Sequence, residues 1–291
     1  MATDVALAVD VGGTKIACGL VDEEAHLLAR HQVATPATAD GEELWSVVAA
    51  AVDVVATSDV TVCGVGCGGP MTGGGELVSP LNIPAWRDFP LRARLAAKLG
   101  VPVAVDNDAK ALALGEGWVG AAAGEQNFIA MVVSTGVGGG IVLDGRLLDG
   151  ADGNAGHIGH VIVEPDGHVC GCGARGCLEA EASGTAIRRI TGHSPKDAPR
   201  DVRVRTGTLV GRAIASVANL LDLRLAVVAG SVALGYGEPF FTAAQAEIDE
   251  RARLSFSAGA VVRPAGLGAD GPLVGAAAVG YRLLRGPDLQ R

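Results

Sequence analysis

A strand followed by a glycine-rich polar turn, a second strand and an acidic turn occurs twice in this chain. The first copy occupies about residues 5–24 and the second about residues 128–145. Each strand is short and apolar, and helical patterns follow both copies, which is typical of α/β proteins. The repetition predicts an α/β chain of two related lobes with a cleft between them.

The rest of the chain alternates between helical and strand patterns. Further strands are expected at 60–66, 101–105 and 225–229, and helices at 41–58, 90–99, 109–117, 208–221 and 272–285. The pattern predicts a smaller lobe formed by residues 1–117 with the C-terminal segment 272–291. A larger lobe is expected over residues 118–271.

Composition limits the classes of function. Of the 291 residues 49% are hydrophobic and only 19% are charged, so the chain can bury a large core. The net charge of −9 disfavours nonspecific binding to nucleic acid or to an anionic membrane. The N-terminus has no signal-peptide pattern and no apolar run is long enough to cross a bilayer, so we expect a cytoplasmic protein with no membrane or nucleic-acid partner.

The first glycine-rich turn, Asp10-Val-Gly-Gly-Thr-Lys15, is a candidate phosphate loop. Gly12 and Gly13 allow close approach of the backbone, Thr14 and Lys15 can donate hydrogen bonds, and Asp10 can hold Mg²⁺ through water. The spacing fits neither a Walker A loop nor a Rossmann fingerprint, and a hairpin without a ligand is the simpler alternative.

A second phosphate loop is expected over residues 134–140, and two such loops can bind one polyphosphate. A strand end at residues 230–231 is a candidate for the nucleoside side. The candidate nucleotide contacts in this half of the chain are Thr135, Gly136, Gly138, Gly230 and Ser231.

A cluster of metal-binding residue types follows the second loop. His160, Cys170, Cys172 and Cys177 form a Cys₃His set, which is typical of a closed structural zinc site. A disulfide, a redox pair and unpaired buried thiols are the alternatives. Three of the six cysteines lie within eight residues, which indicates metal binding in a reducing compartment rather than a secreted disulfide framework.

Acidic residues lie where a predicted strand meets a predicted helix. Asp106, Asn107 and Asp108 fall at the carboxyl end of the strand, where ligand sites of α/β proteins gather. A carboxylate there can take the proton of a hydroxyl that attacks phosphorus. All three can equally cap the helix, and spacing does not choose among them. Lys110, in the helix that follows, is expected on a solvated surface.

Four motifs in order along nearly the whole chain resemble the ROK family (repressors, open reading frames and sugar kinases). They are the two glycine-rich turns, the Asn107-Asp108 pair, and His160 with Cys-x-Cys-Gly-x-x-Gly-Cys-x-Glu through Glu179. The resemblance implies an actin-like (ribonuclease H-like) two-lobed sugar kinase fold. It also implies a homodimer or homotetramer that transfers the γ-phosphoryl group of Mg²⁺-bound ATP to a hexose hydroxyl.

The resemblance also implies residue roles. Asp108 is then the general base, and His160 binds structural zinc with one ring nitrogen while presenting the other to the sugar. The expected hexose contacts are Gly69, Asn82, Asn107, Asp108, His157, His160 and Glu179.

Two departures from the usual ROK pattern stand out. Most ROK sugar kinases carry Glu-x-Gly-His, whereas this chain has His157 in the Glu position. His-x-Gly-His occurs in some bacterial N-acetylmannosamine kinases, so the hexose is left open between glucose and N-acetylmannosamine. The stretch between Ile187 and Thr208 is shorter than usual, and Pro195 and Pro199 interrupt its helical pattern.

Two non-catalytic alternatives remain. ROK repressors bind sugar and carry an N-terminal helix-turn-helix extension. This chain starts its first strand by about residue 5 and is acidic, so we do not expect a DNA-binding function. A sugar-binding protein that has lost catalysis is also conceivable, although Asp10, both turns and Asp108 are all present.

Overall fold

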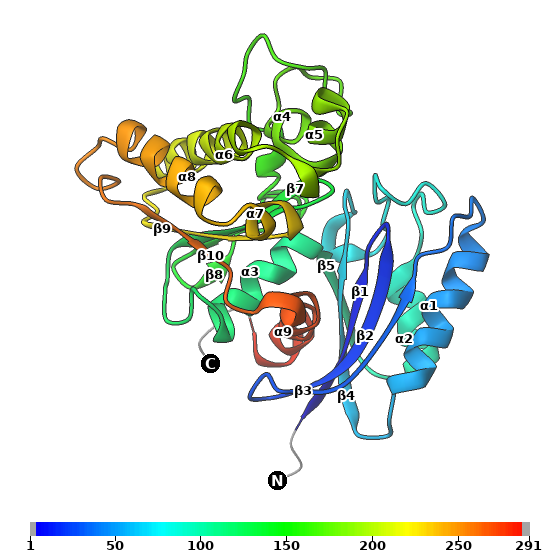
Figure 1. The fold of residues 1–291 in the computed structure, drawn as a ribbon. Coiled ribbons are helices and arrows are strands. Elements are labelled where there is room, and N and C mark those ends of the chain that lie inside the picture. Colours follow the sequence, from blue (N-terminus) through cyan, green and yellow to red (C-terminus); the bar gives the residue numbers. More distant parts are fainter. Residues whose placement is uncertain (1–3, 287–291) are drawn as a thin grey trace. The chain divides into compact units, whose positions relative to one another are not determined.

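The computed structural model describes residues 4–286; the ends of the predicted lobes at 1–3 and 287–291 lie outside the described residues. Two five-stranded mixed sheets form the frame (Figure 1). The chain divides into two compact units. The first comprises the described part of residues 1–124, 145–155 and 267–291, and the second residues 125–144 and 156–266. The lobe bounds given from the sequence stay a prediction.

The sheet of the first unit has the strand order β3-β2-β1-β4-β5. Its strands are β1 (Val5–Val11), β2 (Lys15–Asp22), β3 (Leu27–Ala34), β4 (Val60–Cys67) and β5 (Val103–Asn107). β1 pairs antiparallel with β2 and parallel with β4, and β4 pairs parallel with β5. The carboxyl ends of β1, β4 and β5 therefore lie along one edge of the sheet.

Helices cover both faces of this sheet. Successive β1 side chains point to opposite faces, and the apolar side chains on each face are buried by helices. Leu7 and Val9 pack with α1 (Gly41–Val55) and α2 (Leu91–Leu99). Ala6 and Ala8 pack with α9 (Gly271–Arg285) on the other face (Figure 1). The last predicted helix thus packs on the N-terminal sheet, beside α3 (Asp108–Val119).

The other sheet has the order β10-β9-β6-β7-β8, and all of its strands except β8 belong to the second unit. Its strands are β6 (Phe128–Val133), β7 (Val137–Leu143), β8 (Arg146–Leu147), β9 (Leu225–Ala229) and β10 (Val261–Pro264). Read from β8, the order is third, second, first, fourth and fifth strand, as in the first sheet. This shared topology supports the duplication that the sequence predicts.

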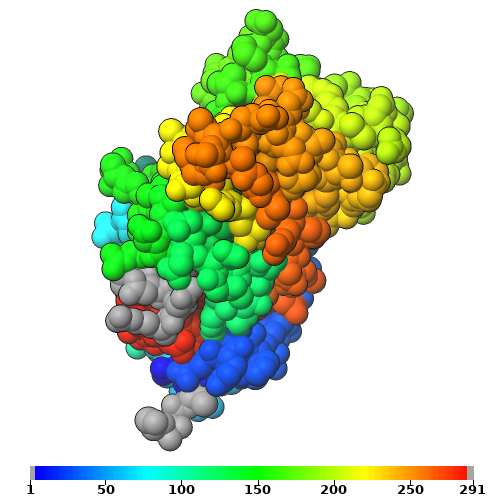
Figure 2. All heavy atoms as spheres, turned by 90° about the vertical axis from the view of Figure 1, so that its left-hand side faces the viewer, coloured from blue at the N-terminus to red at the C-terminus, as the bar shows by residue number. Residues whose placement is uncertain are grey.

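Five α-helices belong to the described part of the second unit. They are α4 (Leu178–Ala182), α5 (Gly184–Thr191), α6 (Arg200–Leu221), α7 (Ser231–Tyr236) and α8 (Glu238–Arg251). α6 and α8 pack along each other, and Figure 2 shows their outer side as a continuous yellow and orange surface. Short 3₁₀ turns lie at Gly73–Gly75, Ile158–His160, Pro195–Asp197 and Gly268–Asp270.

Two sequence-based boundaries differ most from the structure. The second glycine-rich loop was expected over 134–140, but β7 begins at Val137 and its glycines pair with β6. The turn is closed by Ser134, whose N–H donates to the Gly136 carbonyl at 2.9 Å. The helix expected at 208–221 begins at Arg200 instead, directly after Pro199. Proline suits a helix start because it has no N–H group that would need a hydrogen-bond acceptor there.

Candidate active site and metal centre

A row of residues crosses the carboxyl-end edge of the first sheet. Asp10 of β1 lies opposite Gly66 of β4, which lies opposite Asp106 of β5. Asp10 is only 8% exposed, and burial, with the nearby charge of Asp108, raises its pKa to about 7. Lys15 acts in the opposite direction on this pKa. The carboxylates of Asp10 and Asp108 therefore repel each other, and a bound cation would reduce that repulsion.

The first glycine-rich turn is braced by its neighbours. The Gly12 N–H donates to the Lys15 carbonyl at 2.9 Å, and the Thr35 hydroxyl donates to the Gly12 carbonyl at 2.6 Å. A Cβ placed on Gly13 would meet the Asn82 carbonyl at 2.9 Å and its amide nitrogen at 3.1 Å. Candidate phosphate and hexose residues of the first unit therefore lie in contact.

Structure separates the roles of the three residues that spacing left equal. The Asn107 side chain caps α3 by accepting from the Ala109 N–H at 3.0 Å. Asp106 is buried, accepts from the Asn107 N–H at 2.8 Å and pairs with Lys110 at 3.0 Å. Asp108 is exposed, and its Oδ1 accepts from the Ala109 N–H at 2.8 Å. Of the two carboxylates, Asp106 is buried and Asp108 is the one accessible to a substrate.

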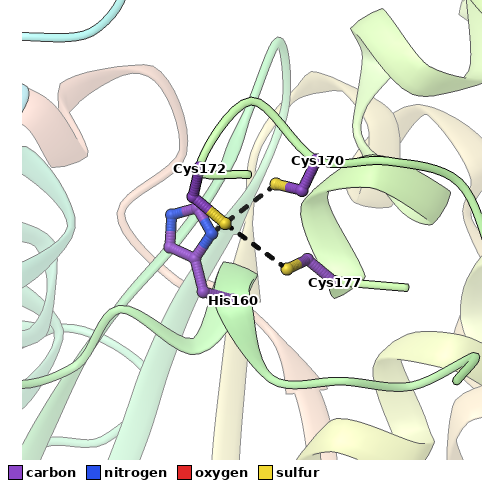
Figure 3. Close-up of side chains that lie close together, drawn as sticks. All are labelled: His160, Cys170, Cys172 and Cys177. Atoms are coloured by element: carbon purple, nitrogen blue, oxygen red, sulfur yellow. Dashed lines mark hydrogen bonds between the residues drawn. The ribbon is translucent and has the colours of Figure 1, made fainter. Parts of the chain in front are cut away.

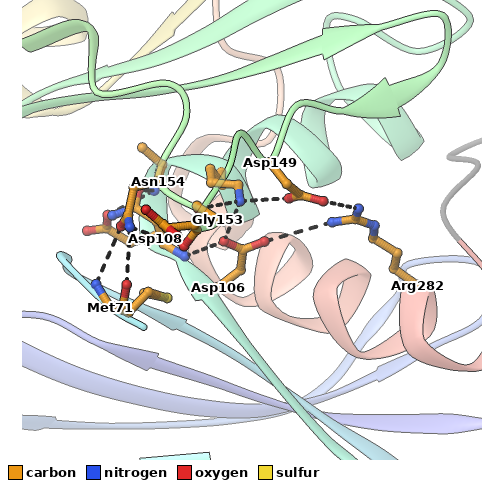
Figure 4. A network of polar contacts seen from close by, with 11 residues as sticks. Met71, Asp106, Asp108, Asp149, Gly153, Asn154 and Arg282 are labelled. Atoms are coloured by element: carbon orange, nitrogen blue, oxygen red, sulfur yellow. Dashed lines mark hydrogen bonds and ion pairs between the residues drawn. The ribbon is translucent and has the colours of Figure 1, made fainter. Parts of the chain in front are cut away.

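The expectation for Lys110 was wrong. Its side chain is 3% exposed, and Nζ lies 3.0 Å from Asp106, 2.9 Å from Asp149 and 2.9 Å from the Gly153 carbonyl. Arg282 of α9 pairs with Asp149 at 2.9 Å (Figure 4). Helical patterning missed this cluster because its members are up to 176 positions apart in the chain (106 to 282).

The segment held by Lys110 also reaches the loop that contains Gly69. Asn154 accepts from the Met71 N–H at 3.4 Å and donates to the Met71 carbonyl at 3.1 Å (Figure 4). The Gly69 carbonyl accepts from the Leu81 N–H at 3.1 Å, beside Asn82. Polar contacts thus connect residues 149–154 to the predicted hexose side of the first unit.

Replacing Lys110 with Met is expected to lower the free energy of unfolding by about 3–5 kcal/mol, because the change leaves buried Asp106 without its partner. Lys98→Met is the matched control, since Lys98 pairs with Asp53 at the surface and such a pair contributes about 0–1 kcal/mol. Urea unfolding of both variants measures the difference. Equal stability of the two would contradict the buried network.

The second turn contacts two other segments of its own unit. The Ser134 hydroxyl lies 3.0 Å from the Ser231 hydroxyl, just after Gly230 at the end of β9. The Ser134 carbonyl accepts from the Gly184 N–H at 2.7 Å. The structure therefore places the turn beside Gly230 and Ser231, which the sequence assigned to the nucleotide.

Glu179 lies against the same turn. Its Oε2 accepts from the Val137 N–H at 3.0 Å, and a Cβ on Gly136 would meet that oxygen at 2.8 Å. Glycine at position 136 therefore leaves room for the carboxylate. A residue predicted to bind hexose is thus held directly by the predicted phosphate turn.

Four side chains converge in the segment between β7 and α4. The ligand atoms of His160, Cys170, Cys172 and Cys177 all lie within 4.8 Å of one another (Figure 3). The Cys172 and Cys177 sulfurs are 3.7 Å apart, and Cys170 Sγ is 3.7 Å from His160 Nδ1. Ligand atoms of a tetrahedral zinc with zinc–sulfur bonds of about 2.3 Å lie about 3.8 Å apart.

The cluster fits a metal better than its alternatives. All six cysteines are free thiols. Burial raises the pKa of Cys177 to about 12, whereas hydrogen bonding, first from the Ala174 backbone, lowers the pKa of exposed Cys172. A cation would favour the thiolate of both. His160 faces the sulfurs with Nδ1, which leaves Nε2 for another partner.

His157 is exposed, and its ring centroid lies 6.1 Å from that of His160. The residue that departs from the usual pattern is therefore a neighbour of the proposed metal ligand. A second acidic and histidine group, Asp22, Glu24 and His26, also comes together, but the Asp22 side chain there accepts the N–H groups of its own turn.

Comparison with known proteins identifies the family. The ROK family model matches residues 6–282. The chain belongs to the ROK family. A ROK family glucokinase from Streptomyces griseus, solved in complex with glucose and AMPPNP, is 32% identical with a TM-score of 0.83, over 96% of this chain and 99% of that one. The α/β, actin-like two-lobed fold class expected from the sequence is confirmed.

Curated relatives carry two different names. A glucokinase of Streptomyces coelicolor is 38% identical over 199 residues, which are 68% of this chain but only 62% of the glucokinase. An N-acetylmannosamine kinase of Citrobacter koseri is 36% identical over 246 residues, which are 79% of this chain and 84% of that kinase. Among residues 4–286, no helix has the length and apolar character needed to cross a membrane.

Proposed function

We propose that this ROK protein is an ATP-dependent hexose kinase of the glucokinase type. It transfers the γ-phosphoryl group to a sugar hydroxyl, O6 by preference. The observation that carries the proposal is the Asn107–Asp108 pair at the start of α3, with Asp108 exposed beside buried Asp10. The names of the relatives support the same class of reaction.

Asp108 acts as the general base. A hexose hydroxyl donates its proton to the Asp108 carboxylate as the oxygen attacks the γ-phosphorus, and the bond to ADP breaks. Asn107 positions Asp108 because it caps the same helix. In the first unit the proposed hexose contacts are Gly69, Asn82, Asn107 and Asp108.

Both glycine-rich turns bind the nucleotide phosphates. In the first unit the contacts are Asp10, Gly12, Gly13, Thr14 and Lys15. Asp10 would hold the Mg²⁺ that comes with ATP, and that ion would neutralise phosphate charge. In the second unit the contacts are Thr135, Gly136, Gly138, Gly230 and Ser231, supported by the hydroxyl contact of Ser134 with Ser231.

A structural zinc would brace the hexose contacts of the second unit. His160, Cys170, Cys172 and Cys177 hold the ion, and the set leaves no open position for catalysis. With Nδ1 on the metal, the His160 ring is fixed and Nε2 hydrogen-bonds to the sugar. His157, His160 and Glu179 are the proposed contacts.

N-acetylmannosamine is the second candidate substrate. His157 favours it, because a neutral imidazole both donates and accepts a hydrogen bond whereas a carboxylate only accepts. A non-catalytic sugar-binding role is the remaining alternative. We further propose a homodimer or homotetramer in the cytoplasm, with no nucleic-acid or membrane partner.

A coupled assay of ADP release tests the kinase assignment. We expect turnover with Mg-ATP on at least one of glucose, mannose, N-acetylglucosamine, N-acetylmannosamine and allose. The preferred sugar decides between glucose and N-acetylmannosamine. No turnover on any of the five would contradict the kinase assignment.

A further inference from the structure

A buried glutamate near the metal cluster belongs to none of the sites assigned above. Glu181 lies one turn of α4 beyond Cys177 and is only 1% exposed. Its Oε1 accepts from the His168 backbone N–H at 2.6 Å and lies 2.9 Å from His168 Nδ1. Its Oε2 accepts from Arg205 Nη2 at 2.7 Å, and Arg205 Nη1 donates to the Glu181 carbonyl at 3.1 Å. The carboxylate therefore joins α4 to α6 on one side and to the loop of His168 on the other.

His168 is the point where the two arms of the cysteine loop, residues 167–177, meet. One arm runs from His168 to Cys170, two residues further along the chain. The other arm returns to His168, whose carbonyl accepts from the Gly176 N–H at 2.9 Å, and Gly176 directly precedes Cys177. Glu181 is on the helix that begins after Cys177. By holding His168 it fixes the backbone that carries Cys170 relative to Cys177.

The close approach of the cysteine loop to Glu181 depends on a glycine. A Cβ on Gly167 would clash with Glu181 Oε1 and would lie 2.9 Å from the Glu164 carbonyl. A larger residue at position 167 therefore moves the loop away from the carboxylate. The Gly167 carbonyl also accepts from Arg175 Nη1 at 2.7 Å, so the start of the loop and its returning arm are held together at this point.

These contacts require a carboxylate at position 181. Oε1 faces donors of His168 and Oε2 faces a donor of Arg205, so both oxygens are needed as acceptors. A glutamine would present its NH₂ group on one of the two sides, where it would face another donor. A buried ion pair contributes little net stability, because the cost of removing charge from water offsets the attraction. The geometry that Glu181 imposes on the loop therefore explains it better than stability alone.

We propose that Glu181 is a positioning residue for the metal site, which holds Cys170 and Cys177 at the separation that the ion needs. This inference rests on the zinc site of the proposed function and names the residue that orders its ligands before the ion binds. Partners outside the ligand set typically change metal affinity by about 10–100-fold. Glu181 acts on the backbone rather than on a ligand side chain, so we expect the lower end of that range.

Competition with a chromogenic zinc chelator measures the zinc affinity of the full chain. Glu181→Gln is expected to weaken zinc binding about tenfold. Gly167→Ala should do the same, since it moves the loop from the carboxylate without changing a charge. Glu247→Gln is the matched control for the first variant, because Glu247 is also buried and paired with an arginine of α6. Gly171→Ala is the control for the second, because a Cβ there meets nothing within 4 Å. Neither control should change the zinc affinity.

The KM of the hexose separates positioning from a purely structural role. In Glu181→Gln the KM should rise when free zinc is scarce and return to the wild-type value when zinc is in excess. The kcat at saturating hexose and zinc should be unchanged. A loss of stability alone would instead lower the amount of active protein and leave the KM as it is in the wild type.

Wild-type zinc affinity in both Glu181→Gln and Gly167→Ala would overturn the inference, and so would an equal loss of affinity in the two controls. If Glu181→Gln does not fold, Gly167→Ala decides alone. A wild-type chain that binds no zinc would overturn the inference together with the zinc site. Weakened zinc binding in a chain that phosphorylates no sugar would support the positioning role and contradict the proposed kinase. Sugar turnover with unchanged zinc affinity in both variants would do the reverse.

Discussion

Asp108→Asn is expected to reduce hexose-dependent ADP release by about 10²–10⁴-fold, the usual contribution of a general base. The amide has the shape of the carboxylate but cannot take the proton of the attacking hydroxyl. Its oxygen can still accept from the Ala109 N–H, so helix α3 keeps that contact. We therefore expect the loss in kcat, with little change in the KM of the hexose.

Metal content serves as the control for this variant. Asp108 is in the first unit and the Cys₃His cluster is in the second, so the zinc content of Asp108→Asn should equal that of the wild type. The unfolding midpoint should not fall, because Asp108 is exposed and the variant removes a charge that acts against buried Asp10. A variant that turns over at a near wild-type rate would show that Asp108 is not the base.

Cys172→Ser is expected to lose the metal and to raise the KM of the hexose by at least about tenfold. Losing a partner that orients a binding side chain typically costs about 10–100-fold in affinity or activity. Cys172 is the exposed member of the cluster, so serine fits its position without disturbing a packed core. Without the ion, His160 Nδ1 has no metal to hold the ring in place, so Nε2 is no longer oriented toward the sugar.

Metal analysis of purified protein measures this directly. We expect about one zinc per chain in the wild type and in Cys18→Ala, whose thiol lies in the core of the first unit, but almost none in Cys172→Ser. About one zinc per chain in the serine variant would contradict the assigned ligand set. A loss of zinc without any change in hexose affinity would contradict the bracing role.

Short-range patterns predicted much of this molecule. The Cys₃His set was readable because its three cysteines lie within eight residues, and the structure brings them together with His160. Both turns follow apolar strands, and the first falls where the sequence placed it. The second proved tighter, because Val137 and the glycines after it continue the sheet.

Contacts over long chain distances could not be read in the same way. Spacing left Asp106, Asn107 and Asp108 equal because burial is what separates them. Arg282, which lies 3.9 Å from the Asp106 carboxylate, comes from far along the chain. Lys110 was expected on a solvated surface because two of its partners, Asp149 and Gly153, lie far from it in the sequence.

Identification of the phosphorylated product tests the central claim most directly. The chain is incubated with Mg-ATP and its preferred hexose, and the reaction is followed by phosphorus and proton NMR. The proposed function predicts a hexose carrying one new phosphate on O6, formed in equal amount to ADP, and none with Asp108→Asn. Release of ADP and free phosphate without a phosphorylated sugar would contradict it.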